Sequence, residues 1–343
     1  MTGISRALPQ CLLLCFFLGV AAFAQSPVAL PSGNSGIASK YPGDVNIKSD
    51  PAVLFADDFE SYTSLSGSAM QTQLFSHGWT NLYHQDQVII DTAQAYKGTK
   101  ALRFSVPGGG VNLANAIERA ISPKVDKVFL RAYTRFGFPS AITGSEHNGI
   151  VATANYQGSG IAANGTNHFY VGMQNSQENY SAGAATPGWT DTYIYYPGSR
   201  NCDTPTVCWG DHFYPNGTVD PFTNTPFDWG PYFVSRPQFT PKQNQWYSYE
   251  LMVQANTPGL KDGRIAEWID GNLIADYQNL RLRDVNTLKI DRVELDLYMQ
   301  SSPASVSYKW YDNVVVATSY IGPVASSASG APAPPTGLAA IVN

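Results

Sequence analysis

Histidine and tyrosine recur at a spacing of two in the middle third of this chain. Tyr193 and Tyr195 flank one isoleucine, and His168 and Tyr170 flank one phenylalanine. Residues two apart in an extended strand point to the same side, so each pair can present both polar groups to one groove. Imidazole and phenol groups transfer protons when a site tunes their pKa values. The spacing therefore indicates acid–base chemistry, although a sheet also uses such rings simply for packing.

A stretch rich in aromatic residues follows these pairs. Residues 197–245 contain Trp209 and His212 and show little periodicity. Loops of that length in a compact domain are usually functional or disordered, and the aromatic content argues against disorder. We therefore expect long loops that wall a cleft, with Trp209 and His212 in contact with a ligand.

The elements that must position these residues are strands, and their pattern is clearest in residues 246–323. Apolar and polar residues alternate there with a period of two, so that Tyr249, Leu251 and Val253 share one side. The Asp270-Gly271 pair marks a two-residue hairpin turn. Several such hairpins predict an all-β fold, a two-sheet antiparallel β-sandwich with long loops over a concave face.

The beginning of the chain predicts export. Residues 1–24 have the features of a secretory signal peptide: Arg6 supplies a positive start, an apolar run follows, and Ala22-Phe23-Ala24 is a small-x-small cleavage motif. We expect the mature protein to be secreted, either extracellular or periplasmic, and to have no membrane attachment after cleavage.

The remaining residues divide into three segments. Residues 25–50 are rich in Ser, Gly and Pro and are expected to form a flexible N-terminal segment. Residues 51–324 are expected to form one β-sandwich domain, a jelly roll. Residues 325–343 have the Ala-, Ser- and Pro-rich composition of a linker, and their end resembles the start of a fibronectin type III module.

The charge and the aromatic content of the chain bear on which classes of molecule it binds. The formal net charge is −5, only 14% of residues are charged, and no basic run occurs, so nucleic acid is not an expected partner. Aromatic residues make up 13% of the chain. Their number fits either the β propensity of aromatic residues or stacking on the flat faces of sugars.

The two cysteines outside the signal segment are Cys202 and Cys208. In an oxidising compartment we expect them to form a disulfide that closes a small loop. Metal binding by two isolated thiols is the alternative.

Four motifs spread along the chain resemble those of a known superfamily. The chain resembles the concanavalin A-like lectin/glucanase jelly rolls over residues 52–323, and is most similar to the polysaccharide lyase-type domains that cleave alginate or glucuronan. The motifs are Asp57-Asp58-Phe59-Glu60, Gly98-Thr99-Lys100-Ala101-Leu102-Arg103, Trp268-Ile269-Asp270-Gly271 and Tyr311-Asp312-Asn313-Val314-Val315-Val316.

The resemblance implies a concave sheet face that binds a glycan chain. Lyase-type members carry a Tyr-x-Tyr pair there, which Tyr193 and Tyr195 match. The chain lacks the lysine that one lyase pattern places on an earlier strand. No organic cofactor is implied.

Elimination at a uronate needs a base for the C5 proton, a group that neutralises the carboxylate, and an acid for the leaving oxygen. We predict that Tyr193 or Tyr195 is one proton carrier and that His147 or His168 is the other. The residues predicted to bind substrate are Arg135 and Asn148 at the carboxylate, with Tyr170, Trp209 and His212.

The resemblance also implies a structural calcium ion away from the concave face. Asp58 and Glu60 lie near the start of the domain and Asp312 near its end, where the terminal strands of such sandwiches pair. Carboxylate oxygens suit calcium, so these three residues are the predicted ligands. The alternative is that the acids only decorate strand ends.

Two other functions are consistent with the same fold. A glycoside hydrolase needs two positioned carboxylates, and Glu294 and Asp296 share a side of one strand. The resemblance implies the Glu-x-Asp-x-x-Glu motif of laminarinase-type members, but Met299 stands where the second glutamate of that motif would be. A non-catalytic glycan-binding module of a larger secreted protein needs no catalytic group at all. We predict a secreted polysaccharide lyase acting on an acidic glycan, with the binding module as the alternative.

Overall fold

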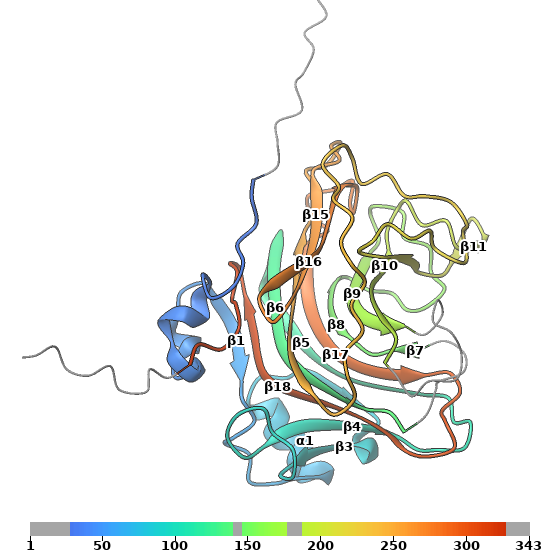
Figure 1. The fold of residues 1–343 in the computed structure, drawn as a ribbon. Helices are drawn as coiled ribbons and strands as arrows, with labels where there is room; N and C mark the ends of the chain where they lie inside the picture. Colours follow the sequence, from blue (N-terminus) through green and yellow to red (C-terminus); the bar gives the residue numbers. More distant parts are fainter. Residues whose placement is uncertain (1–27, 140–145, 177–186, 327–343) are drawn as a thin grey trace, which may run out of the picture.

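Two antiparallel sheets face each other in the part of the chain that the computed structural model describes, residues 28–139, 146–176 and 187–326 (Figure 1). The predicted all-β, two-sheet jelly-roll sandwich is confirmed. The predicted signal peptide (1–24) and most of the predicted linker (325–343) lie outside the described residues.

Sheet A has eight strands and begins and ends the domain. They are β1 (Val53–Asp57), β3 (Val88–Asp91), β4 (Ala101–Val106), β6 (Lys127–Gly137), β14 (Trp246–Gln254), β15 (Gly263–Ile269), β16 (Asn272–Leu280) and β18 (Ser307–Ala317). The order across the sheet is β16-β15-β14-β6-β18-β4-β3, and β1 also pairs with β18. The first and last strands are therefore neighbours.

Sheet B also has eight strands and comes largely from the middle of the chain. They are β2 (Asn81–Tyr83), β5 (Leu113–Val125), β7 (Glu146–His147), β8 (Ile150–Ala154), β9 (Phe169–Ser176), β10 (Trp189–Tyr195), β13 (Asp211–Phe213) and β17 (Ile290–Met299). The order is β13-β10-β9-β8-β17-β5-β2, and β7 pairs with β17. Every histidine and tyrosine predicted for the site except His168 belongs to one of these strands, and His168 directly precedes β9.

The alternating pattern sends one side of each strand into the core between the sheets. Tyr249, Leu251 and Val253 of β14 lie in this core, as the sequence predicted, together with Val171 of β9 and Ile194 of β10. The predicted hairpin turn is also present: Asp270 and Gly271 have φ of 49° and 76°, the left-handed values that a two-residue turn between β15 and β16 requires.

The outer face of sheet A is covered by both ends of the domain. The short 3₁₀ helices η1 (Ile37–Lys40), η2 (Pro42–Asp44) and η3 (Ile47–Ser49) pack beside β1 (Figure 1). Ile37 and Ile47 are buried in a second apolar cluster with Trp268 and Ile321. The described part of the segment 25–50 is therefore held in the fold, in contrast to the flexible segment expected from its composition, because its few apolar residues are buried.

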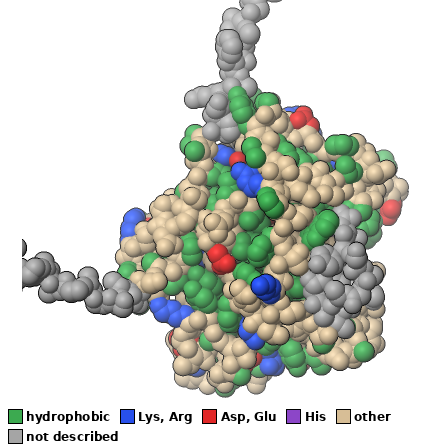
Figure 2. All heavy atoms as spheres, viewed as in Figure 1, with side chains coloured by type: hydrophobic (Ala, Val, Ile, Leu, Met, Phe, Trp, Pro, Cys, Tyr) green, Lys and Arg blue, Asp and Glu red, His purple; other side chains and the backbone are tan. Residues whose placement is uncertain are grey.

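The other elements connect the strands. Helix α1 (Gly67–Ser76) lies between β1 and β2, and Met70 and Leu74 anchor one side of it in the core. The remaining elements are η4 (Gln85–Gln87) and the small hairpin of β11 (Cys202–Thr204) and β12 (Val207–Cys208). On the face shown in Figure 2, charged side chains are few and scattered among hydrophobic and polar ones.

Candidate active site

The candidate site is built on the outer face of sheet B. In β10, Thr190, Thr192 and Ile194 point towards the core, so the alternate residues Asp191, Tyr193 and Tyr195 point outwards. Strand pairing then sets their neighbours. The register places Gln174 opposite Asp191, His212 opposite Tyr193, and Tyr170 opposite Tyr195.

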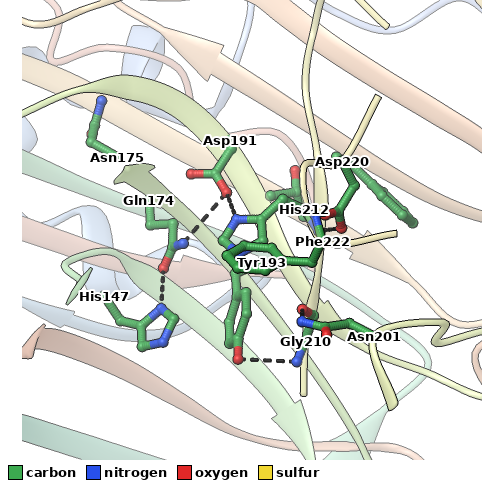
Figure 3. Close-up of polar contacts among 12 residues, drawn as sticks. His147, Gln174, Asn175, Asp191, Tyr193, Asn201, Gly210, His212, Asp220 and Phe222 are labelled. Carbon is green, nitrogen blue, oxygen red and sulfur yellow. Dashed lines mark hydrogen bonds and ion pairs between the residues drawn. The ribbon is translucent and has the colours of Figure 1, made fainter. Parts of the chain in front are cut away.

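A hydrogen-bonded chain links His147 to the carboxylate of Asp191 (Figure 3). Nδ1 of His147 lies 2.9 Å from Oε1 of Gln174, and Nε2 of Gln174 lies 3.4 Å from Oδ2 of Asp191. An amide oxygen only accepts and an amide nitrogen only donates, so Nδ1 of His147 carries the proton. Its Nε2 then has a lone pair and is able to accept a proton.

The same carboxylate contacts a second imidazole. Oδ2 of Asp191 forms an ion pair and hydrogen bond with Nδ1 of His212. The backbone N–H of His212 donates to Oδ2 of Asp220 at 2.7 Å, which fixes the strand that carries the ring. Burial raises the pKa of Asp191, and its ion pair with His212 opposes that shift. One buried acid therefore orients two histidines, directly and through an amide.

The ring of Tyr193 lies between these two imidazoles. Its centroid is 4.2 Å from that of His147 and 5.0 Å from that of His212. Its hydroxyl lies 3.1 Å from the hydroxyl of Tyr195 and accepts a hydrogen bond from the N–H of Gly210 at 3.0 Å. The phenol is therefore held at its ring and at its oxygen.

Burial keeps both central groups neutral at neutral pH. It lowers the pKa of His147 to about 4, against an opposing effect of the hydrogen bond to Gln174. Burial also raises the pKa of Tyr193 well above its usual value, and the nearby Tyr195 adds to the shift. A neutral imidazole is a proton acceptor and a neutral phenol is a proton donor, so the site holds one of each side by side.

Tyr170 and Tyr195 extend the aromatic floor of the site. Their ring centroids are 6.0 Å apart, and Tyr170 lies at the same distance from Tyr193. Beyond them, Glu294 and Asp296 point outwards from β17, since their neighbours Val293 and Leu295 lie in the core. The pKa values of both acids are raised, first by burial.

The disulfide between Cys202 and Cys208 is present and confirms that prediction. It closes the β11–β12 hairpin, which is followed directly by Trp209 and Gly210. Trp209 is 41% exposed on the rim, and its indole N–H donates to Asp203 at 3.0 Å. The hairpin therefore presents an accessible ring next to the residue that holds the Tyr193 hydroxyl.

His168 lies on the same outer face but towards its other end. It is fully buried, with its ring 5.7 Å from Tyr156 and 6.4 Å from Tyr195. No contact joins it to His147 among the described residues. Of the two histidines considered as proton carriers, His147 is therefore the one beside Tyr193.

Arg135 and Asn148 do not lie where a substrate carboxylate would meet the histidine–tyrosine cluster. Arg135 projects from the outer face of sheet A, where it lies over Trp310 and bonds Asn244. Asn148 is fully buried, and its amide bonds the backbone N–H and C=O of Asn175. The alternation of β6 sends Arg135 to the wrong sheet face, and Asn148 takes the place of a missing strand partner.

The predicted calcium ligands bond backbone groups. Asp312 accepts from the N–H groups of Tyr96 at 2.8 Å and Lys97 at 3.2 Å, and Glu60 accepts from Thr99 at 2.8 Å. Within the described ranges, no three His, Cys, Asp or Glu side chains converge as a metal-binding group. Asp58 accepts from the N–H of Glu60. The residues present do not form a calcium cage in this arrangement, and calcium binding stays a prediction.

Gln174 and Asp191 were missed in the sequence. Their even spacing from the predicted tyrosines could have revealed them. Gln174 follows Tyr170 by four residues and so shares its strand face, and Asp191 precedes Tyr193 by two residues and shares that one. His212 was placed in a loop wall, whereas it lies in β13 and pairs with β10.

Comparisons with known proteins give structural matches only. No family model matches the chain, and no curated protein matches its sequence. The alginate lyase of the PL-14 type from Aplysia kurodai superposes with a TM-score of 0.53 and 16% identity, covering 78% of this chain and 99% of that one. A mutant of the alginate lyase Aly36B, in complex with alginate trisaccharide, gives 0.51 and 15%, covering 77% and 97%.

A third match is the alginate lyase vAL-1 from Chlorella virus, with a TM-score of 0.50, 10% identity, and coverage of 75% of this chain and 99% of that one. At these identities the likeness concerns the fold. The chain has the concanavalin A-like jelly roll that these lyases share, and it spans nearly the full length of each.

Proposed function

We propose that this protein is a secreted polysaccharide lyase that cleaves an acidic, uronate-containing glycan by β-elimination. The observation that supports this most directly is the contact between His147 and Tyr193, a proton acceptor and a proton donor with ring centroids 4.2 Å apart. The fold shared with three alginate lyases agrees with it.

In the proposed reaction, Nε2 of His147 removes the proton from C5 of the uronate. The electrons of that C–H bond form the C4–C5 double bond, and the bond from C4 to the glycosidic oxygen breaks. The hydroxyl of Tyr193 gives its proton to the leaving oxygen. Water then returns a proton to Tyr193 and takes one from His147, so the enzyme ends each cycle unchanged.

The carboxylate of the substrate must lose part of its negative charge before C5 becomes acidic enough. We assign this role to the imidazole of His212, because the Asp191 carboxylate beside it stabilises positive charge on the ring. A cation next to Tyr193 would meet the substrate carboxylate as the charge on C5 develops. In this proposal His212 has the role that we predicted for Arg135 and Asn148.

Export is part of this proposal. The signal-like residues 1–24 and the Cys202–Cys208 disulfide both suit an oxidising compartment outside the cytoplasm. In the described ranges no helix is long and apolar enough to span a bilayer. Mass spectrometry of protein recovered from the medium or periplasm should show Gln25 as the first residue.

The activity is tested by mixing the purified protein with alginate, glucuronan and pectate and following the ultraviolet absorbance of the unsaturated product. Absorbance that rises on one polymer, and fails to rise with Tyr193→Phe, supports the lyase. Binding to a polymer without product would support the glycan-binding module instead. New reducing ends without absorbance would point to hydrolysis at Glu294 and Asp296.

A further inference from the structure

A lysine lies in the core of the sandwich, directly beneath the candidate site. Lys309 belongs to β18 of sheet A and pairs with Phe104 and Phe136, both core residues. Its side chain has no exposed surface, and Nζ lies 4.3 Å from the ring centroid of Phe136. A charge in such a position is costly unless specific groups stabilise it.

The groups that stabilise it are Asp296 of β17 and two residues of the segment that carries His147, Glu146 and Asn148. Nζ of Lys309 donates a hydrogen bond to the carbonyl oxygen of Asn148. Burial lowers the pKa of Lys309 to about 7, and the carboxylates of Asp296 and Glu146 oppose that shift. The ammonium group thus reaches across the core from sheet A to the residues on either side of His147.

This segment needs such support because ordinary strand pairing is interrupted in it. His147 pairs with Tyr298, and pairing resumes only at Ile150 with Leu295. In the gap, the side chain of Asn148 replaces a backbone partner for Asn175. Gly149 still bonds Asp296 of β17: its carbonyl accepts from the backbone N–H of Asp296 at 3.1 Å, and its own N–H donates to Oδ1 of Asp296. The carbonyl of Asn148 finds its partner in the side chain of Lys309 instead.

A second side chain from the same strand as Lys309 contacts the next carbonyl, which also accepts from the backbone N–H of Asp296. The hydroxyl of Tyr311 lies 2.7 Å from the carbonyl oxygen of Gly149 and 2.8 Å from that of Asp296. Two residues apart on β18, Lys309 and Tyr311 point into the core together. Their polar ends meet the carbonyls of two consecutive residues, 148 and 149.

We propose that Lys309 and Tyr311 are positioning residues that set the place of His147 from the opposite sheet. They act on the backbone of residues 148 and 149, and through it on the imidazole that faces Tyr193. The claim that this positioning serves proton transfer rests on the proposed function. The claim that Lys309 and Tyr311 hold the imidazole in place does not.

The buried charge of Lys309 indicates a role beyond stabilising the fold, because burying a charge costs free energy. A buried ion group stabilises a fold no better than well-packed apolar side chains of similar size do, and often less well. A lysine aimed at one carbonyl, however, holds that carbonyl in a single position, since the carbonyl would otherwise be buried without a donor. General-base catalysis requires such precision, because a displacement of about 1 Å costs roughly 100-fold in rate.

The test uses the full mature protein with histidine labelled by ¹⁵N, as Lys309→Met and Tyr311→Phe. The first change removes the ammonium and keeps a side chain of similar length; the second removes only a hydroxyl. We expect the ¹⁵N signals of His147 to move or broaden in both variants. On a polymer that the wild type cleaves, kcat should fall roughly 10- to 100-fold while KM changes little.

The matched control is Lys127→Met, since Lys127 belongs to the same sheet but lies over Phe129 on its outer face. It should leave the signals of His147 and kcat unchanged. If Lys309→Met does not fold, Tyr311→Phe decides alone. His147 signals at their wild-type positions in the folded variants would overturn the proposal, as would an equal fall of kcat in the control.

The ¹⁵N signals of His147 test the positioning proposal independently of the proposed lyase function. If the wild type eliminates no uronate polymer, the lyase assignment fails, while the signals of His147 still report whether Lys309 and Tyr311 hold the ring.

Discussion

The ring of His147 lies against the ring of Tyr193, with centroids 4.2 Å apart and planes inclined by 31°. Burial lowers the pKa of the imidazole to about 4 and raises that of the phenol well above its usual value. The two groups are neighbours, but their pKa values are shifted in opposite directions. This difference assigns His147 as the base and Tyr193 as the acid.

Removing the hydroxyl of Tyr193 should remove the acid. In Tyr193→Phe the ring keeps its contacts with His147 and His212, so the fold should be retained. We expect kcat to fall by about 100-fold or more, because general-acid catalysis contributes roughly that much. Single-turnover rates and the melting temperature, measured together, check this.

Tyr195→Phe is the matched control for that variant. Its hydroxyl contacts that of Tyr193 at 3.1 Å, but it belongs to the next outward-facing residue of β10. We expect a smaller loss of rate. If Tyr195→Phe abolished turnover while Tyr193→Phe left it unchanged, the two tyrosines would have to exchange roles.

The pH dependence of kcat should show one acid limb. His147 must be unprotonated to act as base, and burial lowers its pKa to about 4, so activity should be lost as the pH falls through that value. Tyr193 must be protonated, and its raised pKa predicts no alkaline loss from this group at moderately alkaline pH. A pH profile of kcat, with substrate binding measured separately, checks both. An acid limb near neutrality would contradict the assignment of His147.

Gly210 leaves room for Tyr193. A Cβ at this position would overlap the ring of Tyr193, while the backbone N–H donates to its hydroxyl. Gly210→Ala should therefore displace the ring and lower kcat by about 10-fold or more, with a smaller effect on stability. Gly259→Ala, in a turn with open space around it, is the control and should leave kcat unchanged. Equal rates in the wild type and Gly210→Ala would show that the Tyr193 ring tolerates a shift.

Reduction of the Cys202–Cys208 disulfide should also loosen the position of Tyr193. Cys208 is two residues from Gly210, so the covalent link limits the motion of the chain that binds the Tyr193 hydroxyl. Closing a loop of this size contributes about 2 kcal/mol to the free energy of unfolding. We expect the Cys202→Ser/Cys208→Ser variant to remain folded, to melt earlier and to turn over more slowly. The wild type under a mild reductant should behave in the same way. An unchanged kcat in the reduced wild type and in the double variant would show that the disulfide does not act on Tyr193.

A buried acid between the sheets should make stability depend on pH. Glu267 accepts a hydrogen bond from Thr192, and burial raises its pKa to about 8, with the nearby Asp191 adding to the shift. Because the folded pKa lies above the unfolded one, this group's contribution is fully present below the unfolded pKa. It is lost as the pH rises through about 8.

Glu267→Gln removes that titration. At acid pH the variant and the wild type should have similar free energies of unfolding. Above pH 8 the variant should be the more stable by a few kcal/mol, since one pKa unit corresponds to about 1.4 kcal/mol. Urea unfolding at both pH values checks this, and parallel pH curves for the two proteins would contradict it.

Several features of the fold could be predicted from residue patterns because they are local. The alternation around Tyr249 and Leu251 places these residues in the core, and the Asp270-Gly271 pair forms the expected turn. The spacing of Tyr193 and Tyr195 places both on one face. Helix α1 was not predicted, since only Met70 and Leu74 anchor it and the pattern is short.

Other features depended on partners far away in the chain. Arg135 alternates as regularly as Tyr193 does, yet it belongs to sheet A and faces away from the site. Asn148 stands beside His147 but turns inwards to bond Asn175. Neither outcome could be derived from the residues alone, since alternation does not specify which side of a strand faces the core.

The sequence by itself determined that the chain forms strands, that its imidazoles and phenols share strand faces, and that two cysteines can close a small loop. These follow from a period of two and from short-range spacing. The tertiary structure decided that His212 pairs with Tyr193, that His147 meets them from β7, and that Asp191 orients both histidines. Such contacts depend on strand order and register, which arise only when distant segments bury their apolar sides together.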